Sequence, residues 1–131
     1  MERFTDFGIL FLRIALGGMM AWHGFPKFIG GVPLWTEIGG SMAFMGVTIY
    51  PVFWGFCAAV AEFFGGIAFA FGLFTRIVSL LLAFTMVVAA VMLFRTGAGL
   101  QGASQAIELG SVFIAMIFIG PGQYSVDRRL N

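Results

Sequence analysis

The feature that most constrains this fold is an uncharged apolar run of membrane-spanning length. Residues 77–94 read IVSLLLAFTMVVAAVMLF and contain no ionisable side chain. A helix needs about 20 mostly apolar residues to cross the ~30 Å hydrocarbon core of a bilayer. Three further apolar runs, at residues 7–25, 51–74 and 104–119, approach this length. The sequence therefore predicts an all-α membrane protein, a four-transmembrane-helix bundle in which residues 1–131 form a single domain.

The composition argues against several other classes of protein. Hydrophobic residues make up 60% of the chain and charged residues 10%, and the mean hydropathy is +1.01. A soluble domain of 131 residues could not bury so much apolar surface. A membrane β-barrel is the weaker alternative, because it needs many alternating segments of about ten residues and a closed edge. The net charge of +1 offers no basic surface to nucleic acid.

Neither a disulfide framework nor a cleaved signal is expected. Cys57 is the only cysteine, so an intrachain disulfide and a C-x-x-C redox pair are both excluded. The first apolar run has no small-residue cleavage site behind it, and Glu2 and Asp6 dilute the positive start of a secretory signal. We expect this run to be retained as a helix.

Proline, glycine and serine mark the expected helix ends. Pro26 is expected to end the first helix, and Pro51 suits the first turn of the second, since proline lacks a donor that is unpaired there. Ser104 is a candidate N-cap of the fourth helix, and Gly120 to Gly122 would stop it. The long first loop, residues 27–49, should be structured and hold a short helix at the membrane surface.

Basic residues near the helix ends predict the orientation. Four arginines fall on one side of the predicted bundle, and one lysine and one arginine fall on the other: Arg3, Arg76, Arg128 and Arg129 against Lys27 and Arg95. The positive side is expected to face the cytoplasm, so both termini should lie there. Arg76 and Arg95, at helix ends, suit interfacial anchors.

Small residues four positions apart predict close contacts between helices, because such pairs share one helix face. Three pairs fit this spacing: Gly17 with Ala21, Gly55 with Ala59, and Ala61 with Gly65.

Ionisable side chains within the predicted spans need partners, water or a function, because a charge at bilayer depth costs about 2.5 kcal/mol or more. At 1.5 Å per residue, Arg13 lies about 9 Å from one edge of the core and Glu62 about 16 Å from the other. Their depths then differ by about 5 Å, so the sequence predicts an ion pair between them. His23, Lys27, Arg95 and Glu108 fall together near the outer edge.

Two interpretations of these polar residues stay open at this stage. The ion pairs could serve only to neutralise charge and fix helix register, or the residues could line a polar cavity. His23 can titrate near neutrality, donate to a quinone carbonyl or ligate a metal. One histidine alone cannot build a bis-histidine haem site or a zinc site, so no metal site is predicted.

Several short motifs together resemble the DoxX family of small bacterial membrane proteins. They are LRIALGG (residues 12–18), HGFPK (23–27), EFFGG (62–66), GLFTR (72–76), then Glu108 and the ending GPGQYSVD (120–127). The resemblance covers nearly the whole chain. It implies a four-helix protein of the bacterial inner membrane, often linked to redox systems; the family name comes from a membrane subunit of a thiosulfate to quinone oxidoreductase.

The resemblance also marks a set of family-pattern positions in this chain: Arg13, His23, Lys27, Glu62, Arg76, Glu108, Ser125 and Asp127. Five of these are candidates for a polar pocket: Arg13, His23, Lys27, Glu62 and Glu108. Arg76, Ser125 and Asp127 are expected to be structural. Asp127 in particular should accept hydrogen bonds from turn amides or pair with Arg76.

Three functions remain as hypotheses. The first is a redox-associated subunit whose pocket binds a quinone or a similar amphipathic molecule, with electrons supplied by a partner protein. The second is a noncatalytic accessory subunit of a larger membrane complex. The third, a small transporter, is less favoured because the chain shows no inverted repeat. Membrane lipid, other membrane or redox subunits and a second copy of the chain are the expected partners.

Overall fold

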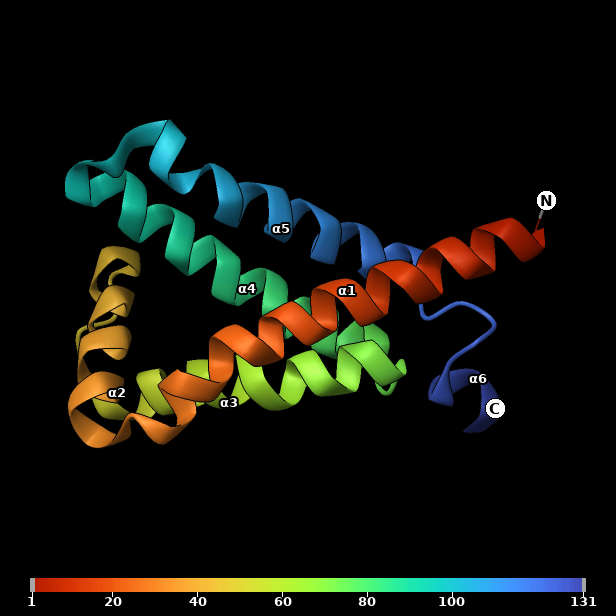
Figure 1. Ribbon diagram of the computed structural model, residues 1–131. Coiled ribbons are helices and arrows are strands. Elements are labelled where there is room, and N and C mark those ends of the chain that lie inside the picture. Colours follow the sequence, from red (N-terminus) through yellow and green to blue (C-terminus); the bar gives the residue numbers. More distant parts are fainter. Residues whose placement is uncertain (1, 131) are drawn as a thin grey trace.

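The computed structural model describes residues 2–130, and its regular structure in this range is entirely helical (Figure 1). The elements, in chain order, are α1 (Glu2–Ile29), α2 (Gly31–Gly39), the 3₁₀-helix η1 (Gly40–Met45), α3 (Pro51–Phe71), α4 (Thr75–Leu93), the π-helical turn η2 (Phe94–Ala98), α5 (Gly99–Ile119) and α6 (Val126–Leu130). The predicted all-α class is confirmed.

Within residues 2–130, three helical segments are long and apolar enough to cross a membrane: Glu2–Ile29, Pro51–Phe71 and Thr75–Ile119. The third segment is 45 residues long and contains α4, η2 and α5. It turns back at η2, so α4 and α5 lie side by side (Figure 1). Gly97 and Gly99 allow this turn, because their φ angles of 94° and 68° favour glycine. The expected third and fourth spans are therefore the two arms of one apolar segment.

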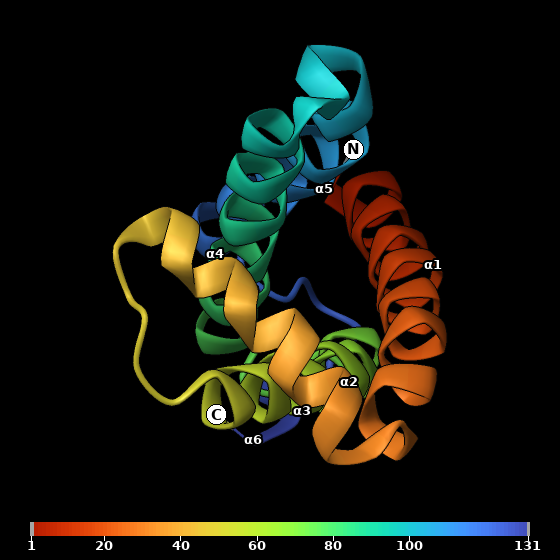
Figure 2. The same cartoon turned by 90° about the vertical axis from the view of Figure 1, so that its left-hand side faces the viewer.

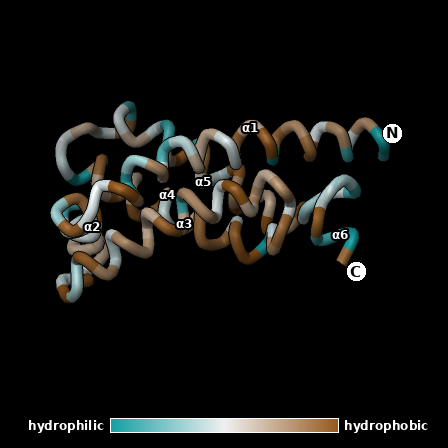
Figure 3. The backbone as a smooth tube through the Cα atoms, turned by 60° about the horizontal axis from the view of Figure 1, so that its bottom comes forward, coloured by the Kyte–Doolittle hydropathy of each residue, from teal (hydrophilic) through white to brown (hydrophobic). Residues whose placement is uncertain are grey.

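Polar residues concentrate toward the ends of the bundle. In Figure 3 the long helices are mostly hydrophobic, whereas hydrophilic residues gather near the N-terminus and in α6. The N-terminus and α6 lie at one end of the bundle, and α2 lies at the other (Figure 1).

Two of the expected helix ends are wrong. Pro26 lies inside α1, which continues to Ile29. A proline removes one backbone hydrogen bond, and at this exposed position the helix accommodates the loss close to its end. Ser104 lies inside α5, where its hydroxyl donates to the carbonyl of Gln101 at 2.8 Å instead of capping an amide. The fourth span thus begins five residues earlier, at Gly99.

The first loop is structured, as expected. Helix α2 and η1 run across one end of the bundle, and α2 packs on α3 while η1 reaches α4 (Figures 1 and 2). Two glycines permit the close packing of α2 on α3. A Cβ atom at Gly39 would lie 1.6 Å from the carbonyl oxygen of Pro51, and one at Gly55 would lie 1.7 Å from that of Trp35.

Glycines also set the contact between α1 and α3. A Cβ atom at Gly17 would lie 2.5 Å from the carbonyl oxygen of Gly66, and one at Gly66 would lie 2.6 Å from the amide nitrogen of Ala21. Gly17 and Ala21 therefore lie at a helix contact, as their spacing predicts. On α3 the residue facing α1 is Gly66, whereas Gly65 faces Val78 and Leu82 of α4.

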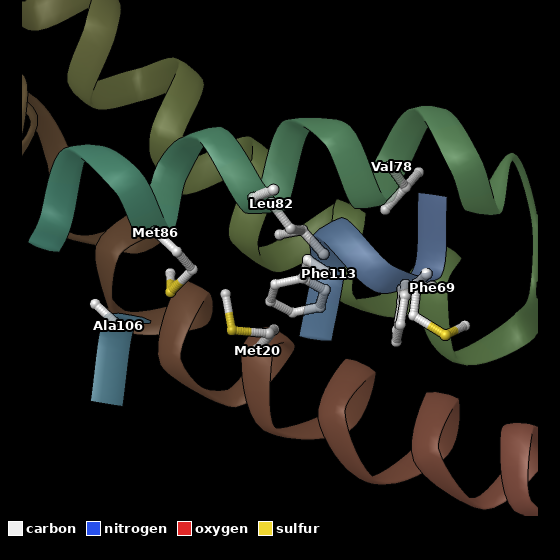
Figure 4. Packing of buried hydrophobic residues seen from close by; sticks show 9 residues of the cluster. Met20, Phe69, Val78, Leu82, Met86, Ala106 and Phe113 are labelled. Carbon is white, nitrogen blue, oxygen red and sulfur yellow. The ribbon is translucent and has the colours of Figure 1, made fainter. Parts of the chain in front are cut away.

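The hydrophobic core lies where the four long helices meet. Phe69 and Phe113 stack edge to face at its centre, with ring centroids 5.3 Å apart. Figure 4 shows this cluster, whose buried members are Met20, Phe69, Val78, Leu82, Ala83, Met86, Ala106, Phe113 and Met116. The core holds α1 and α3 against the α4–α5 pair. Toward the α2 end, α1 and α5 diverge from each other (Figure 2).

Candidate functional site

The central polar feature is an ion pair between α1 and α3. The ammonium nitrogen of Lys27 lies 2.7 Å from Glu62 Oε2 and 3.0 Å from Oε1. Glu62 is 4% exposed, whereas the side chain of Lys27 is 36% exposed. Lysine has three N–H donors, so this geometry leaves donor capacity on the open side of the pair. Glu62 is thus a buried carboxylate whose charge is balanced by a partly accessible cation.

The carbonyl of Lys27 is also held in place. The indole nitrogen of Trp35 in α2 donates to it at 2.8 Å. Trp35 packs in turn against Phe56 of α3, with ring centroids 5.0 Å apart. The last turn of α1 is therefore fixed by α2, which keeps the lysine facing Glu62.

The expected pair between Arg13 and Glu62 is wrong. Helix α1 meets α3 with Gly24 opposite Glu62, because a Cβ atom at Gly24 would lie 2.8 Å from the Cβ of Glu62. Arg13 is eleven residues before Gly24, or about 16 Å along the helix. The depth estimate failed because α1 starts before residue 7 and continues past Pro26, so its register against α3 differs from the one assumed.

A cleft of about 180 Å³ opens beside the ion pair, between α1 and α3 on one side and α4 and α5 on the other. Its polar lining comprises His23, Lys27, Glu62 and Gln105. The remainder of its wall is apolar or small: Met20, Met86, Ala89, Leu93, Gly102, Ala106 and Leu109. Three predicted pocket residues thus come together. Met20, His23 and Lys27 share one face of α1 because they are three and four positions apart.

Gln105 is the cleft residue that sequence reasoning missed. It lies on α5 one turn from Leu109, and both line the cleft. Gln105 carries no charge, so it was not among the ionisable residues that suggested a pocket. Its spacing from Gly102 and Leu109 nevertheless places it on the side of α5 that faces the cleft. The Gln105 amide can both donate and accept hydrogen bonds, whereas the Lys27 ammonium can only donate them.

Two predicted outer residues lie away from the cleft. Glu108 is exposed on α5 and is not part of the cleft wall. It lies two residues past the buried Ala106, about 200° around the helix, so its side chain points away from the core. Arg95 is exposed in η2. The expected outer group of four residues is therefore divided, with only His23 and Lys27 at the cleft.

Arg13 belongs to a second polar cluster, at the opposite end of the bundle. It is 1% exposed, and its guanidinium donates to the carbonyl of Tyr124. Gly72 provides the space for it, since a Cβ atom there would lie 1.9 Å from Arg13 Nη1. The negative charge of Asp127 also attracts the guanidinium of Arg13. This residue thus joins α1 to the C-terminal segment, far from the cleft.

Asp127 accepts hydrogen bonds from turn amides, as predicted. Its two carboxylate oxygens accept from the amides of Phe74 at 2.7 Å and Thr75 at 2.8 Å, at the start of α4. Its own amide donates to the carbonyl of Gly72 at 3.0 Å. An acidic side chain at the N-terminus of a helix pairs free amides and suits the helix dipole.

The other two residues expected to be structural lie at the same end of the bundle. Ser125 is buried, and its hydroxyl donates to the carbonyl of Gly122 at 2.9 Å and accepts from the amide of Arg128 at 3.2 Å. Arg76 lies against Gly120, where a Cβ atom would be 2.9 Å from Arg76 Nη2. These contacts hold residues 120–128 against the bundle.

No group of three histidine, cysteine, aspartate or glutamate side chains within residues 2–130 could hold a metal ion. Cys57 is half-buried and free. The cleft is thus a small recess with a largely apolar wall and four polar groups: one carboxylate, one ammonium, one amide and one imidazole.

The sequence model of the DoxX family matches residues 8–95 of the chain. The chain belongs to the DoxX family. The matched region includes the ion pair and His23, whereas the α5 side of the cleft lies beyond it. The resemblance seen in the motifs is thus confirmed.

Two curated proteins are similar to this DoxX-family chain. The "Inner membrane protein YqjF" of Escherichia coli is 28% identical over 134 residues, covering 100% of the chain and 98% of that protein. The "Putative oxidoreductase CatD" of Bacillus subtilis is 34% identical over 87 residues, covering 66% of the chain and 60% of that protein. No solved structure gives a significant match.

Proposed function

We propose that this DoxX-family protein is a redox-associated subunit of the bacterial inner membrane whose cleft binds the head group of a quinone-like molecule. One observation carries the proposal. The ion pair between the buried carboxylate of Glu62 and the partly exposed ammonium of Lys27 lines a recess between apolar helices. The names of the two relatives, "Inner membrane protein YqjF" and "Putative oxidoreductase CatD", support the location and the redox association.

The size and lining of the cleft suit a single six-membered ring. Cavities of about 150 Å³ can hold a benzene ring, and this cleft measures about 180 Å³. Met20, Met86 and Leu109 supply apolar wall, while the polar groups occupy one side. Ligand sites of this kind combine an apolar wall with a few oriented polar groups.

Hydrogen bonding assigns a role to each polar residue. The Lys27 ammonium donates to one quinone carbonyl, and Glu62 keeps that ammonium charged and oriented. His23 or the Gln105 amide donates to the second carbonyl. Reduction of a quinone to a quinol takes up two electrons and two protons. The electrons come from a partner enzyme, since this chain has no dithiol, and His23 and Glu62 are the groups suited to pass protons.

The arrangement of the termini supports four spans. The start of α1 and α6 lie at the same end of the bundle (Figure 1), which supports an even number of crossings. We propose that α1, α3, α4 and α5 each cross the membrane once. A cytoplasmic location of both termini is supported by the positive-inside rule, because this end carries four arginines: Arg3, Arg76, Arg128 and Arg129.

Binding of a short-tailed quinone to the protein in nanodiscs tests the function. Ala89 lines the cleft, so Ala89→Leu should narrow it and weaken binding at least about tenfold. Ala15 is exposed on α1 outside the cleft, so Ala15→Leu is the matched control and should bind as the wild type does. His23→Ala should also bind more weakly.

Equally weak binding by the wild type and His23→Ala would reject the quinone site. Stoichiometric co-purification of a larger enzyme whose turnover survives loss of the ion pair would then favour the second candidate, an accessory subunit.

A further inference from the structure

The outer face of α5 carries a polar stripe that is not used by the fold or by the cleft. Its polar members follow one another at intervals of three and four residues, and Ala115 continues the same face: Gln101, Ser104, Glu108 and Ser111. This spacing places them on one face of the helix. The buried residues of α5, among them Ala106, Phe113 and Met116, lie on the opposite face. The stripe therefore points away from the bundle.

The carboxylate of Glu108 makes this stripe unsuited to contact with the acyl chains of lipid. It is exposed, and among residues 2–130 it forms no ion pair or hydrogen bond. It lies nine residues past Gly99, or about 14 Å along a helix of 21 residues. A carboxylate at such depth faces a bundle interior, water or a partner charge. In a single copy of this chain it would face acyl chains.

The other residues of the stripe suit a contact between helices. The hydroxyls of Ser104 and Ser111 donate to the carbonyls of Gln101 and Ile107, each at 2.8 Å. Their hydrogen bonds are thus made within the helix, and their side chains are small. Small residues allow membrane helices to approach closely, and a polar group among them adds specificity.

The chain itself carries a group complementary to Glu108. His23 on α1 is exposed, and it lines the same cleft as Gln105 and Leu109. Glu108 lies between Gln105 and Leu109 in α5, so His23 and Glu108 are at one level of the bundle. Imidazole can carry a proton and pair with a carboxylate. Within one copy they form no hydrogen bond or ion pair with each other, since His23 lines the cleft and Glu108 does not.

We propose that the outer face of α5 docks on a second copy of this chain, with Glu108 of one copy meeting His23 at the cleft mouth of the next. The two surfaces differ, so the contact is head to tail. A head-to-tail contact between membrane proteins in one plane closes into a ring when the rotation permits. The neighbouring copy then contributes a carboxylate to the mouth of each cleft.

A symmetric contact between two α5 helices fits the charges less well. It would bring Glu108 of one copy toward Glu108 of the other, and like charges in a membrane interface repel each other. The head-to-tail arrangement instead gives the Glu108 carboxylate a hydrogen-bond donor, the His23 imidazole, and uses both exposed groups. This proposal is argued from the exposed faces of α1 and α5, and it does not depend on what the cleft binds.

Disulfide cross-linking in native membranes tests this contact. In a Cys57→Ala background, copies carrying His23→Cys and Glu108→Cys, each with its own tag, are co-expressed and oxidised. The proposal expects a disulfide between the two tagged chains. A cross-link between two Glu108→Cys copies would overturn it in favour of a symmetric contact. The proposal would also be overturned if no cross-link formed and the protein in nanodiscs had the mass of one copy. This holds even if another protein were found to cover the stripe.

Charge exchange separates a specific contact from a loss of folding. Glu108→Lys and His23→Glu should each weaken self-association at least about tenfold, because the first removes the hydrogen-bond acceptor of His23 and the second places two carboxylates together. The double variant places a lysine opposite a glutamate and should recover most of the association. If both single variants keep the wild-type association, or if the double variant stays dissociated while its helix content matches the wild type, the proposed pairing is contradicted. No quinone is used, so failure here leaves the binding site itself unaffected.

Discussion

Lys27 and Glu62 form a pair of unequal exposure: the carboxylate is buried, while more than a third of the lysine side chain is accessible. This asymmetry has energetic consequences. Loss of the lysine would leave a buried carboxylate without a counter-charge. Loss of the carboxylate would leave a lysine that can bend toward the open side of the cleft.

The first prediction is therefore an order of stability. Lys27→Met should lower the free energy of unfolding by about 3 kcal/mol, and Glu62→Gln by about 1 kcal/mol. The double variant should be more stable than Lys27→Met alone, since it has no unpaired charge. Denaturation in mixed micelles measures these values. Equal losses in both single variants would show that the exposure difference has no energetic effect.

The second prediction concerns two adjacent glycines in α3. A Cβ atom at Gly66 would lie 2.6 Å from the backbone of Ala21, whereas at Gly65 its nearest neighbour would be 3.6 Å away, an ordinary contact. Gly66→Ala should destabilise the protein by about 1 to 3 kcal/mol through forced separation of α1 and α3. Gly65→Ala is the matched control and should be tolerated. A tolerated Gly66→Ala would mean that α1 and α3 are farther apart than described.

The C-terminal segment gives a third prediction. Asp127 pairs two amides at the start of α4, so Asp127→Ala should cost about 1 kcal/mol, typical of a lost helix cap. Hydrogen exchange of the Phe74 and Thr75 amides should become faster. Exchange within α2, at the far end of the bundle, serves as the internal reference. Unchanged exchange at both amides would contradict the capping role.

Orientation gives a fourth prediction. Single cysteines placed at Arg129 and at Thr48, in a Cys57→Ala background, should react with a membrane-impermeant thiol reagent from opposite sides. Arg129 lies in α6, and Thr48 lies in the connection between η1 and α3 at the other end. Intact cells should therefore label position 48 and leave position 129 unlabelled. The reverse pattern would place the termini outside the cytoplasm.

Much of the fold could be predicted from hydropathy, because long apolar runs have few structural solutions in a membrane. The residues at which the helices end were harder to predict. Pro26 normally discourages a helix, yet three further residues of α1 follow it. The location of Lys27 within α1 depends on that last turn, so the ion pair with Glu62 was missed and Arg13 was assigned in its place.

The cleft was only partly predictable for a similar reason. Spacing along α1 identifies a shared face for Met20, His23 and Lys27, but depth alone placed Glu108 beside them. Depth states how far a residue lies along a helix and not which way it faces. The angular position on α5 separates Gln105, which lines the cleft, from Glu108, which is on the outside.

Photoaffinity labelling with an azido-quinone tests the central claim most directly. If the cleft beside Lys27 and Glu62 binds the quinone ring, the label should attach to peptides of α1 and α5 that contain His23 and Gln105. Excess unmodified quinone should prevent this attachment, and Ala89→Leu should reduce it. Labelling spread over the outer helix faces, unaffected by the competitor, would contradict the account.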